Sequence, residues 1–338
     1  MKTSKVIFLL MLALVLALSA GCSGKPIPLE EPVEQVPTAA ELQASLEDNG
    51  STREVTLYYK DLMGYLVPVN CEIPWEEGIA KATLKQMVSS EENDLQAARL
   101  GLLTALPEGL QVDMDIIGQT AKVSLSDECM KCVDAEEENA MVCAIVSALT
   151  EFESIEEVQL LVDGEQVDQL THGTNVGAPL TRADLNIESV SADTDLNGSS
   201  AVQVFFESEA SGCMVPVTRT VFSNPDVDTA VLELLKGPKE DSGLAGCLPR
   251  GVGLISVKQK DGIVTINMSK EFKQVVDQAD GGAAAVKALV LTCSQFDGVK
   301  EVKLQVEGED FQLETETLAA TSVVNTEQEA LMASAVIE

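Results

Sequence analysis

The sequence is poor in aromatic, basic and histidine residues. Aromatic residues make up 4% of the 338 residues, Trp75 is the one tryptophan, and His172 is the one histidine. So few rings argue against a sugar-binding cleft built on stacked aromatic side chains. Acidic residues outnumber basic residues 55 to 22, and the clustered Lys and Arg that contact phosphates in nucleic-acid complexes are missing. The composition therefore predicts no nucleic-acid partner.

Motifs of the common catalytic and cofactor sites are also missing. A Ser-His-Asp triad could use only His172, which lies in THGTNVG with no serine elbow motif. Gly251-Val-Gly253 precedes a predicted strand and does not connect a strand to a helix, so it is not a dinucleotide-binding loop. Paired carboxylates abound because acids abound. The sequence predicts a protein that is not an enzyme and has no cofactor.

The N-terminus has the pattern of a lipoprotein signal peptide. Lys2 and Lys5 precede an apolar run at 6–20, which suits a signal peptide better than a membrane span of about 20 residues. Ala20-Gly21 then precedes Cys22, an order that resembles a bacterial lipobox, although Ser19 stands where Leu is usual. We expect cleavage after residue 21 and a diacylglycerol on Cys22 that anchors the protein on the outer face of the cell membrane. The alternative is an ordinary secretory signal with an incidental cysteine.

The rest of the chain contains an internal repeat. YLVPV at 65–69 matches CMVPV at 213–217, and matched pairs of short blocks follow in the same order, LPEG with LPRG and VDGE with VEGE. We expect an acidic, proline-rich tether at 22–51, a first domain at 52–186 (copy one), a linker at 187–200, a second domain at 201–315 (copy two) and a tail at 316–338. Each copy is long enough to bury its own core.

Periodicity predicts the same element order in both copies. In copy two, short strands are expected at 201–206 and 214–219, and apolar spacing predicts a helix from Val227 that ends at Gly237-Pro238. A hairpin through Asp261-Gly262, a second helix near 281–295 and a strand at 300–308 follow. This β-β-α-β-β-α-β order predicts an α+β fold with the helices packed on one face of a mixed sheet.

The motifs MVPVTR, AVLELLKGP, LPRG and VTINMSKEF resemble the GerMN domain family, named for a lipoprotein of spore germination and sporulation. The resemblance covers both copies and is stronger in copy two. Copy one departs from it, with Cys71 where copy two has Arg219 and VSSEEN in place of KGPKED. The resemblance implies a non-enzymatic extracytoplasmic protein.

A cysteine cluster is the most chemical-looking feature. Cys129-x-x-Cys132, with Cys143 eleven residues on, could suggest zinc, but a second CxxC or a nearby pair of histidines is missing. The acidic stretch VDAEEEN after Cys132 would raise a thiol pKa and oppose redox catalysis. We therefore expect a disulfide or reduced thiols and no metal. The acids at 136–138 are expected to complement a helix dipole.

These observations predict a lipid-anchored scaffold that docks on a membrane-associated protein assembly in sporulation or germination. The alternative is a ligand-binding or cell-wall-binding surface lipoprotein. Copy one has 25 acidic against 8 basic residues at 52–185, whereas copy two has 17 against 11 at 200–315. Copy two is therefore the expected docking copy, and copy one a spacer or a binder of something basic. Arg219 is the candidate interaction residue, able to bind a structural or an interface carboxylate bidentately. If it docks a partner, Arg219→Glu should abolish docking and leave the melting temperature nearly unchanged.

Overall fold

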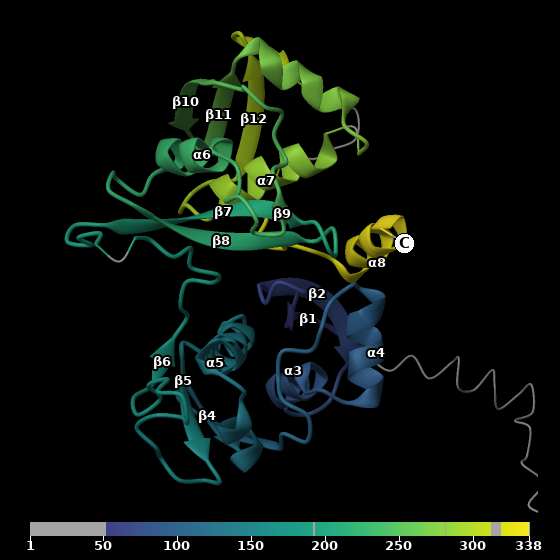
Figure 1. Ribbon diagram of the computed structural model, residues 1–338, viewed down its shortest axis with the longest axis vertical. Helices are drawn as coiled ribbons and strands as arrows, with labels where there is room; N and C mark the ends of the chain where they lie inside the picture. Colours follow the sequence, from purple (N-terminus) through teal and green to yellow (C-terminus); the bar gives the residue numbers. More distant parts are fainter. Residues whose placement is uncertain (1–51, 192, 281, 312–318, 338) are drawn as a thin grey trace, which may run out of the picture. The chain divides into compact units, whose positions relative to one another are not determined.

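The computed structural model describes residues 52–191, 193–280, 282–311 and 319–337 (Figure 1). The predicted signal peptide, Cys22 and the tether up to residue 51 lie outside the described residues. Copy one contains, in order, β1 (Thr52–Lys60), β2 (Leu66–Pro74), α3 (Ile79–Met87), α4 (Glu91–Arg99), β3 (Val112–Ile117), β4 (Thr120–Leu125), α5 (Ala135–Leu149), β5 (Glu157–Val162) and β6 (Leu180–Thr181).

Copy two repeats this order with one helix fewer between its second and third long strands. Its elements are β7 (Ser200–Ser208), β8 (Met214–Val221), α6 (Val227–Leu235), β9 (Leu244–Ala245), β10 (Leu254–Lys260), β11 (Ile263–Met268), α7 (Ala283–Ser294), β12 (Glu301–Val306) and β13 (Glu309–Phe311). A 3₁₀ segment at Asp127–Lys131 precedes α5 in copy one, and another at Lys270–Asp277 precedes α7 in copy two. The C-terminal helix α8 (Glu327–Ile337) follows copy two.

The strands of each copy form two sheets, and two helices lie between them, α3 and α5 in copy one and α6 and α7 in copy two (Figure 1). In copy two, α6 contacts β7 and β10, and α7 contacts β7 and β12. In copy one, α3 contacts β1 and β3, and α5 contacts β1 and β5. The expected α+β fold with helices on one face of a mixed sheet is confirmed for the larger sheet of each copy, and the smaller sheet on the other side of the helices was not predicted. Both faces of the helix layer are apolar enough to be buried, so a second sheet covers what one sheet would leave exposed.

The larger sheet of each copy is mixed. β4 pairs with β5 in parallel, and β11 pairs with β12 in parallel, while the flanking strands run antiparallel. A parallel pair needs a long crossover connection, and α5 and α7 provide it. The order of strands in these sheets, β3-β4-β5-β6 and β10-β11-β12-β13, is the same in both copies.

Local sequence explains the ends of the elements. The β10–β11 hairpin turns at Asp261 and Gly262, whose φ angles are 54° and 84°, as a two-residue turn with both residues left-handed requires. Asp226 accepts a hydrogen bond from Thr229 N at 2.9 Å and so caps the start of α6. Gly237, with φ of 75°, follows its C-terminus.

Buried apolar side chains of both copies form one continuous core, and the two copies belong to one compact unit. Tyr58, Phe206 and Phe272 are the largest of the fully buried side chains. Among the described residues, the helices are all too short or too polar to cross a membrane.

Candidate functional site

The two copies meet through their hairpins, where β2 packs near β8. Asn186, the last residue of copy one, spans this junction with its side chain. Its Oδ1 accepts from Leu66 N at 2.8 Å, and its Nδ2 donates to Leu66 O at 2.8 Å and to Pro216 O at 2.7 Å. One amide therefore ties a strand of copy one to the matching strand of copy two.

Asn325, which follows copy two, makes the reciprocal set of bonds. Its Oδ1 accepts from Met214 N at 2.8 Å, and its Nδ2 donates to Met214 O and Pro68 O, both at 2.9 Å. Leu66 corresponds to Met214 in the repeat, and Pro68 to Pro216. The two asparagines are therefore related by the pseudo-symmetry of the tandem repeat.

The backbone carbonyls of Asn186 and Asn325 also pair across the junction. Thr218 of β8 donates its N–H to Asn186 O at 3.3 Å, and Asn70 of β2 donates its N–H to Asn325 O at 2.7 Å. Asp61 Oδ2 adds a bond from Ser208 Oγ at 3.0 Å. These contacts cover the edges of β2 and β8 and hold the two copies in one fixed arrangement.

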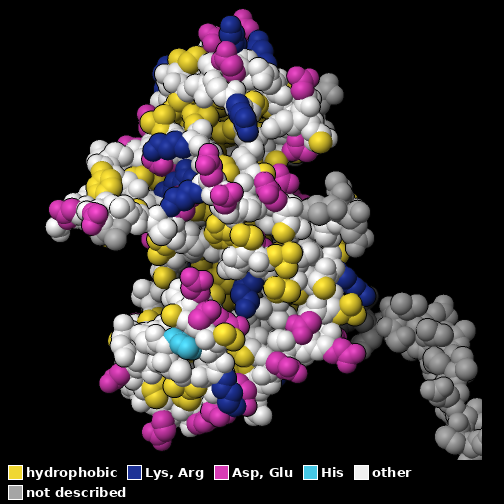
Figure 2. Space-filling view, in the orientation of Figure 1, with side chains coloured by type: hydrophobic (Ala, Val, Ile, Leu, Met, Phe, Trp, Pro, Cys, Tyr) yellow, Lys and Arg dark blue, Asp and Glu magenta, His cyan; other side chains and the backbone are white. Residues whose placement is uncertain are grey.

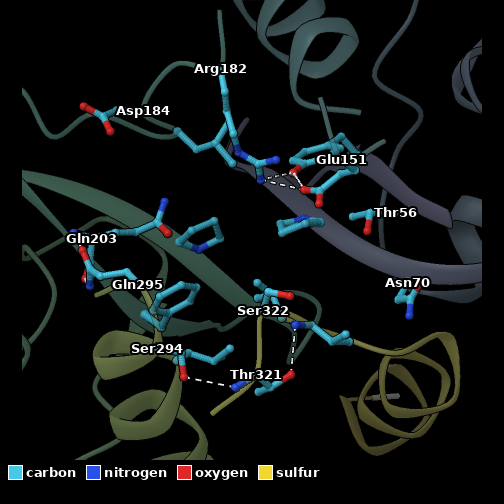
Figure 3. A pocket seen from close by; sticks show the side chains of 18 of the residues that line it. Thr56, Asn70, Glu151, Arg182, Asp184, Gln203, Ser294, Gln295, Thr321 and Ser322 are labelled. Atoms are coloured by element: carbon cyan, nitrogen blue, oxygen red, sulfur yellow. Dashed lines mark hydrogen bonds and ion pairs between the residues drawn. The ribbon is translucent and has the colours of Figure 1, made fainter. Parts of the chain in front are cut away.

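A cleft of about 380 Å³ lies at this junction (Figure 3). The hairpins of both copies line it, together with the ends of α5 and α7 and the two segments that precede Asn186 and Asn325. Corresponding positions face it from the two copies: Tyr58 with Phe205, Pro68 with Pro216, and Glu151 with Gln295. The frame of the cleft is thus repeated, but its chemistry differs between the two halves.

The half from copy one is charged. Glu151 Oε1 accepts from Tyr58 OH at 2.7 Å and from Arg182 Nη2 at 2.6 Å, and Arg182 Nη2 also lies 2.9 Å from the phenol oxygen. Burial, opposed by Arg182 and reinforced by Glu151, raises the pKa of Tyr58 well above its usual range, so the phenol stays neutral and donates. In the other half, Gln295 bonds to the backbone of Gln203 instead.

Arg219 lies inside copy two and is 7% exposed. Its Nε and Nη2 donate to the two carboxylate oxygens of Glu188, at 3.1 and 2.9 Å. Nη1 donates to Glu233 O at 2.6 Å and Nη2 to Gly237 O at 2.7 Å. The guanidinium also sits over the ring of Phe206, with 5.1 Å to the centroid.

Arg219 thus makes the bidentate carboxylate contact considered from the sequence, and the carboxylate belongs to the same chain. Arg219 therefore connects the C-terminal end of α6 to the segment that follows copy one. We call its contacts with Glu188, Glu233 O and Gly237 O the internal clamp. The expectation that Arg219→Glu leaves the melting temperature unchanged is not compatible with this burial. As a candidate contact for a partner, Arg219 is poorly placed.

The cysteine cluster is buried in copy one. Cys129 and Cys132 are buried and Cys143 is half-buried, and all three are free thiols. Burial raises the pKa of Cys129 to about 12 and that of Cys132 to about 11. Within the described ranges, His, Cys, Asp and Glu side chains gather nowhere into a group of three or more suited to a metal.

His172 and the acids at the start of α5 have structural partners. Glu138, fully buried, accepts from His172 N at 2.7 Å and from Thr174 N at 2.9 Å, and His172 Nε2 lies 2.7 Å from Cys132 O. Burial alone would raise the pKa of Glu138, but these bonds outweigh it and lower the pKa. The acids at 136–138 therefore do more than complement the helix dipole, because the Glu138 carboxylate holds the loop that contains His172 and Thr174.

Sequence reasoning missed Asn186, Asn325, Glu151 and Arg182. A signal was present for the asparagines, since Leu185-Asn186 and Val324-Asn325 are similar pairs that each come after the last strands of their half of the repeat. Glu151 and Arg182 lie far apart in sequence, and no spacing connects them. Cys22 lies outside the described residues.

Comparison with known proteins identifies the repeat. The family model described as Germane, sporulation and spore germination, matches residues 56–168 and 203–312. The spore germination protein GerM of Bacillus subtilis (strain 168) is 30% identical over 299 residues, which cover 84% of this chain and 81% of that protein. The solved tandem GerMN domains of the sporulation protein GerM from Bacillus subtilis superpose with a TM-score of 0.70 at 29% identity, covering 82% of this chain and 99% of that one.

These matches confirm the resemblance to the GerMN family and the α+β fold in tandem copies. Both copies are matched separately by the family model, and the solved tandem is matched over nearly its whole length. The chain therefore belongs to the Germane family of sporulation and spore germination proteins.

Proposed function

We propose that this protein is a non-enzymatic scaffold, anchored by a lipid on Cys22 to the outer face of the cell membrane, that docks on a membrane-associated protein assembly during sporulation or germination. The observation that carries the proposal is the reciprocal set of hydrogen bonds by which the side chains of Asn186 and Asn325 join the two copies, here called the asparagine clasp. It fixes two repeated modules in one orientation, which suits a part that positions other proteins. The relatives carry no enzymatic name, which agrees with a non-catalytic role.

The sequence of the N-terminus supports the anchor. A basic start, an apolar run of signal-peptide length and small residues before Cys22 form the pattern that a lipoprotein requires. The tether at 22–51 would then hold the folded unit away from the membrane. Acidic side chains spread over the face in Figure 2, so lipid and not attraction to anionic headgroups would supply the membrane affinity.

The test compares wild-type cells with a deletion strain complemented by wild-type or Cys22→Ala protein. We expect wild-type protein in the membrane fraction with an acylated N-terminal cysteine by mass spectrometry, and Cys22→Ala protein to be unprocessed and unlipidated. Spore yield and germination should fall in the deletion strain and recover only with wild-type protein. An unmodified N-terminus at Ser23 or later would remove the anchor, and unchanged spores in the deletion strain would remove the role.

One observation favours a second candidate function, that of a ligand-binding surface lipoprotein. The cleft between the copies is lined by polar and apolar side chains from both copies, and a concave site with convergent polar groups is where small molecules usually bind. Binding of cell-wall fragments by the purified protein, with loss on Arg182→Ala, would support this second function.

A further inference from the structure

The outer edges of β1 and β7 carry corresponding backbone groups. Thr56 is paired with Asn70, and Gln203 with Thr218. The N–H groups of Asn70 and Thr218 donate away from their hairpins, to Asn325 O and Asn186 O. These are therefore non-hydrogen-bonded pairs of the antiparallel ladder, and the backbone groups of Thr56 and Gln203 also face outward.

In copy two this outward edge is filled by a side chain. Gln295 accepts from Gln203 N at 2.8 Å and donates to Gln203 O at 2.6 Å. A primary amide has one acceptor and one donor side, so a single glutamine satisfies both backbone groups, as an added strand would.

In copy one the corresponding residue is Glu151. An ionised carboxylate can accept but cannot donate, so it cannot satisfy the Thr56 carbonyl. Its Oε1 is also held by Tyr58 and Arg182. Among the residues that the structure describes, none bonds the Thr56 N–H or C=O.

There is room along this edge. Thr56, Asn70 and Glu151 line the cleft between the copies and also a neighbouring hollow of about 520 Å³, which runs along 53–56 and 151–154. Figure 3 shows Thr56 next to Glu151 of the Glu151–Arg182 pair, with Asn70 beyond Thr56. The edge of β1 is therefore open from Arg53 to Thr56. Farther along the strand, Lys60 pairs with Leu103.

We propose that the edge of β1 at Thr56 accepts an extended, basic segment of a partner protein as an added strand. This inference rests on the proposed function and names the chemistry of its partner. The segment supplies one C=O and one N–H to Thr56, as the Gln295 amide does to Gln203 in copy two.

The charge of the site selects a basic segment. The residues that line the cleft and the hollow include the acids Glu54, Glu151, Glu153 and Asp184 against the bases Arg53 and Arg182. Copy one as a whole has 25 acidic against 8 basic residues at 52–185. Lysine side chains that alternate along an added strand would meet this surface, whereas an acidic segment would be repelled.

The test uses the full chain in detergent and a fluorescein-labelled, blocked heptapeptide of alternating valine and lysine, with binding read by fluorescence anisotropy. We expect wild-type protein to bind it at least tenfold more tightly than the same peptide with glutamate for lysine. Glu151→Gln places in copy one the same amide that Gln295 provides in copy two. This amide should close the edge at Thr56, so peptide binding should fall at least tenfold. Glu136→Gln removes the same charge at an exposed position of α5 and should change binding less than twofold.

A second measurement separates strand pairing from charge and needs no variant. N-methylation of the central peptide bonds keeps every lysine but removes the backbone donors, and should weaken binding at least tenfold. Equal binding of the N-methylated peptide, equal binding by Glu151→Gln protein with an unchanged melting temperature, or no binding by wild-type protein would each overturn the inference. Acylation of Cys22 and spore yield are measured independently, so a protein that is anchored and required for sporulation but does not bind the peptide contradicts only this inference.

Discussion

Asn93 of copy one and Arg219 of copy two hold the C-terminal carbonyls of corresponding helices, although they come from different places in the repeat. Asn93 Nδ2 donates to Lys85 O at 2.9 Å and Val88 O at 2.8 Å, at the end of α3. Arg219 donates to Glu233 O and Gly237 O at the end of α6. Where copy one has Cys71 instead of arginine, the extra helix α4 therefore supplies the missing donor. The last carbonyls of a helix have no partner within it, and each copy provides one.

This difference predicts unequal costs for removing the two donors. Arg219→Ala should destabilise the protein by about 3 kcal/mol, because it removes charged hydrogen bonds to two carbonyls and leaves the largely buried Glu188 carboxylate with only the more exposed Lys239, 3.6 Å away. Asn93→Ala should cost about 1 kcal/mol, since it removes neutral bonds at a partly exposed site. Urea unfolding followed by circular dichroism measures both. Similar values for the two variants would contradict the buried clamp.

The asparagine clasps predict a second pair of effects. Asn325→Ala leaves buried groups at Met214 and Pro68 unpaired, and should lower the free energy of unfolding by about 1–3 kcal/mol. Asn186→Ala should act in the same direction, and Asn197→Ala, in an exposed turn, should stay within about 0.5 kcal/mol of wild type. The midpoint of urea unfolding gives the comparison. A clasp variant as stable as Asn197→Ala would mean that the clasp contributes little.

The Glu138 carboxylate predicts a dependence of stability on pH. Its pKa is lower in the folded protein than in the unfolded chain, so its contribution is complete above the unfolded pKa of about 4.3 and is lost as the pH falls through the folded value. Glu138→Gln should therefore lower the melting temperature at pH 7 and flatten its decline in acid. Glu136→Gln, exposed on the same helical turn, serves as the control and should leave the curve unchanged. Parallel curves for wild type and Glu138→Gln would disprove the assignment.

Burial of the cysteine cluster predicts unreactive thiols. Because burial raises the pKa of Cys129 to about 12 and of Cys132 to about 11, few thiolates exist at pH 8. Iodoacetamide should label neither residue in native protein and both in urea, as read by mass spectrometry of peptides. We also expect no stoichiometric zinc in the purified protein. One equivalent of zinc that is lost on Cys129→Ser would revive the metal site.

Much of the fold could be predicted because its signals are local. The hairpin of β10 and β11 turns at the predicted position, since Asp261-Gly262 admits the required left-handed turn. The helix expected from Val227 ends at Leu235 before Gly237, as its capping residues indicate. The division of strands into two sheets was not predicted, because it depends on which faces of the helices are covered from a distance.

The candidate site was far less predictable. Arg219 was identified from the sequence, but its burial decides that it acts within the chain, and burial depends on Glu188 and Phe206. Glu151 and Arg182 meet only because the end of α5 and the segment before Asn186 converge on one cleft. Long-range contacts of this kind leave no periodic trace.

The sequence by itself determined the repeat, the element order, the acidic character and the pattern at Cys22, because each depends on residues that are neighbours or at fixed spacing. Only the tertiary structure decided how the copies are joined, since Asn186 and Asn325 each bond to strands that lie more than a hundred positions away in the chain. It also decided the chemical difference between two equivalent edges. A glutamine closes one and a glutamate leaves the other open, because only an amide can both donate and accept.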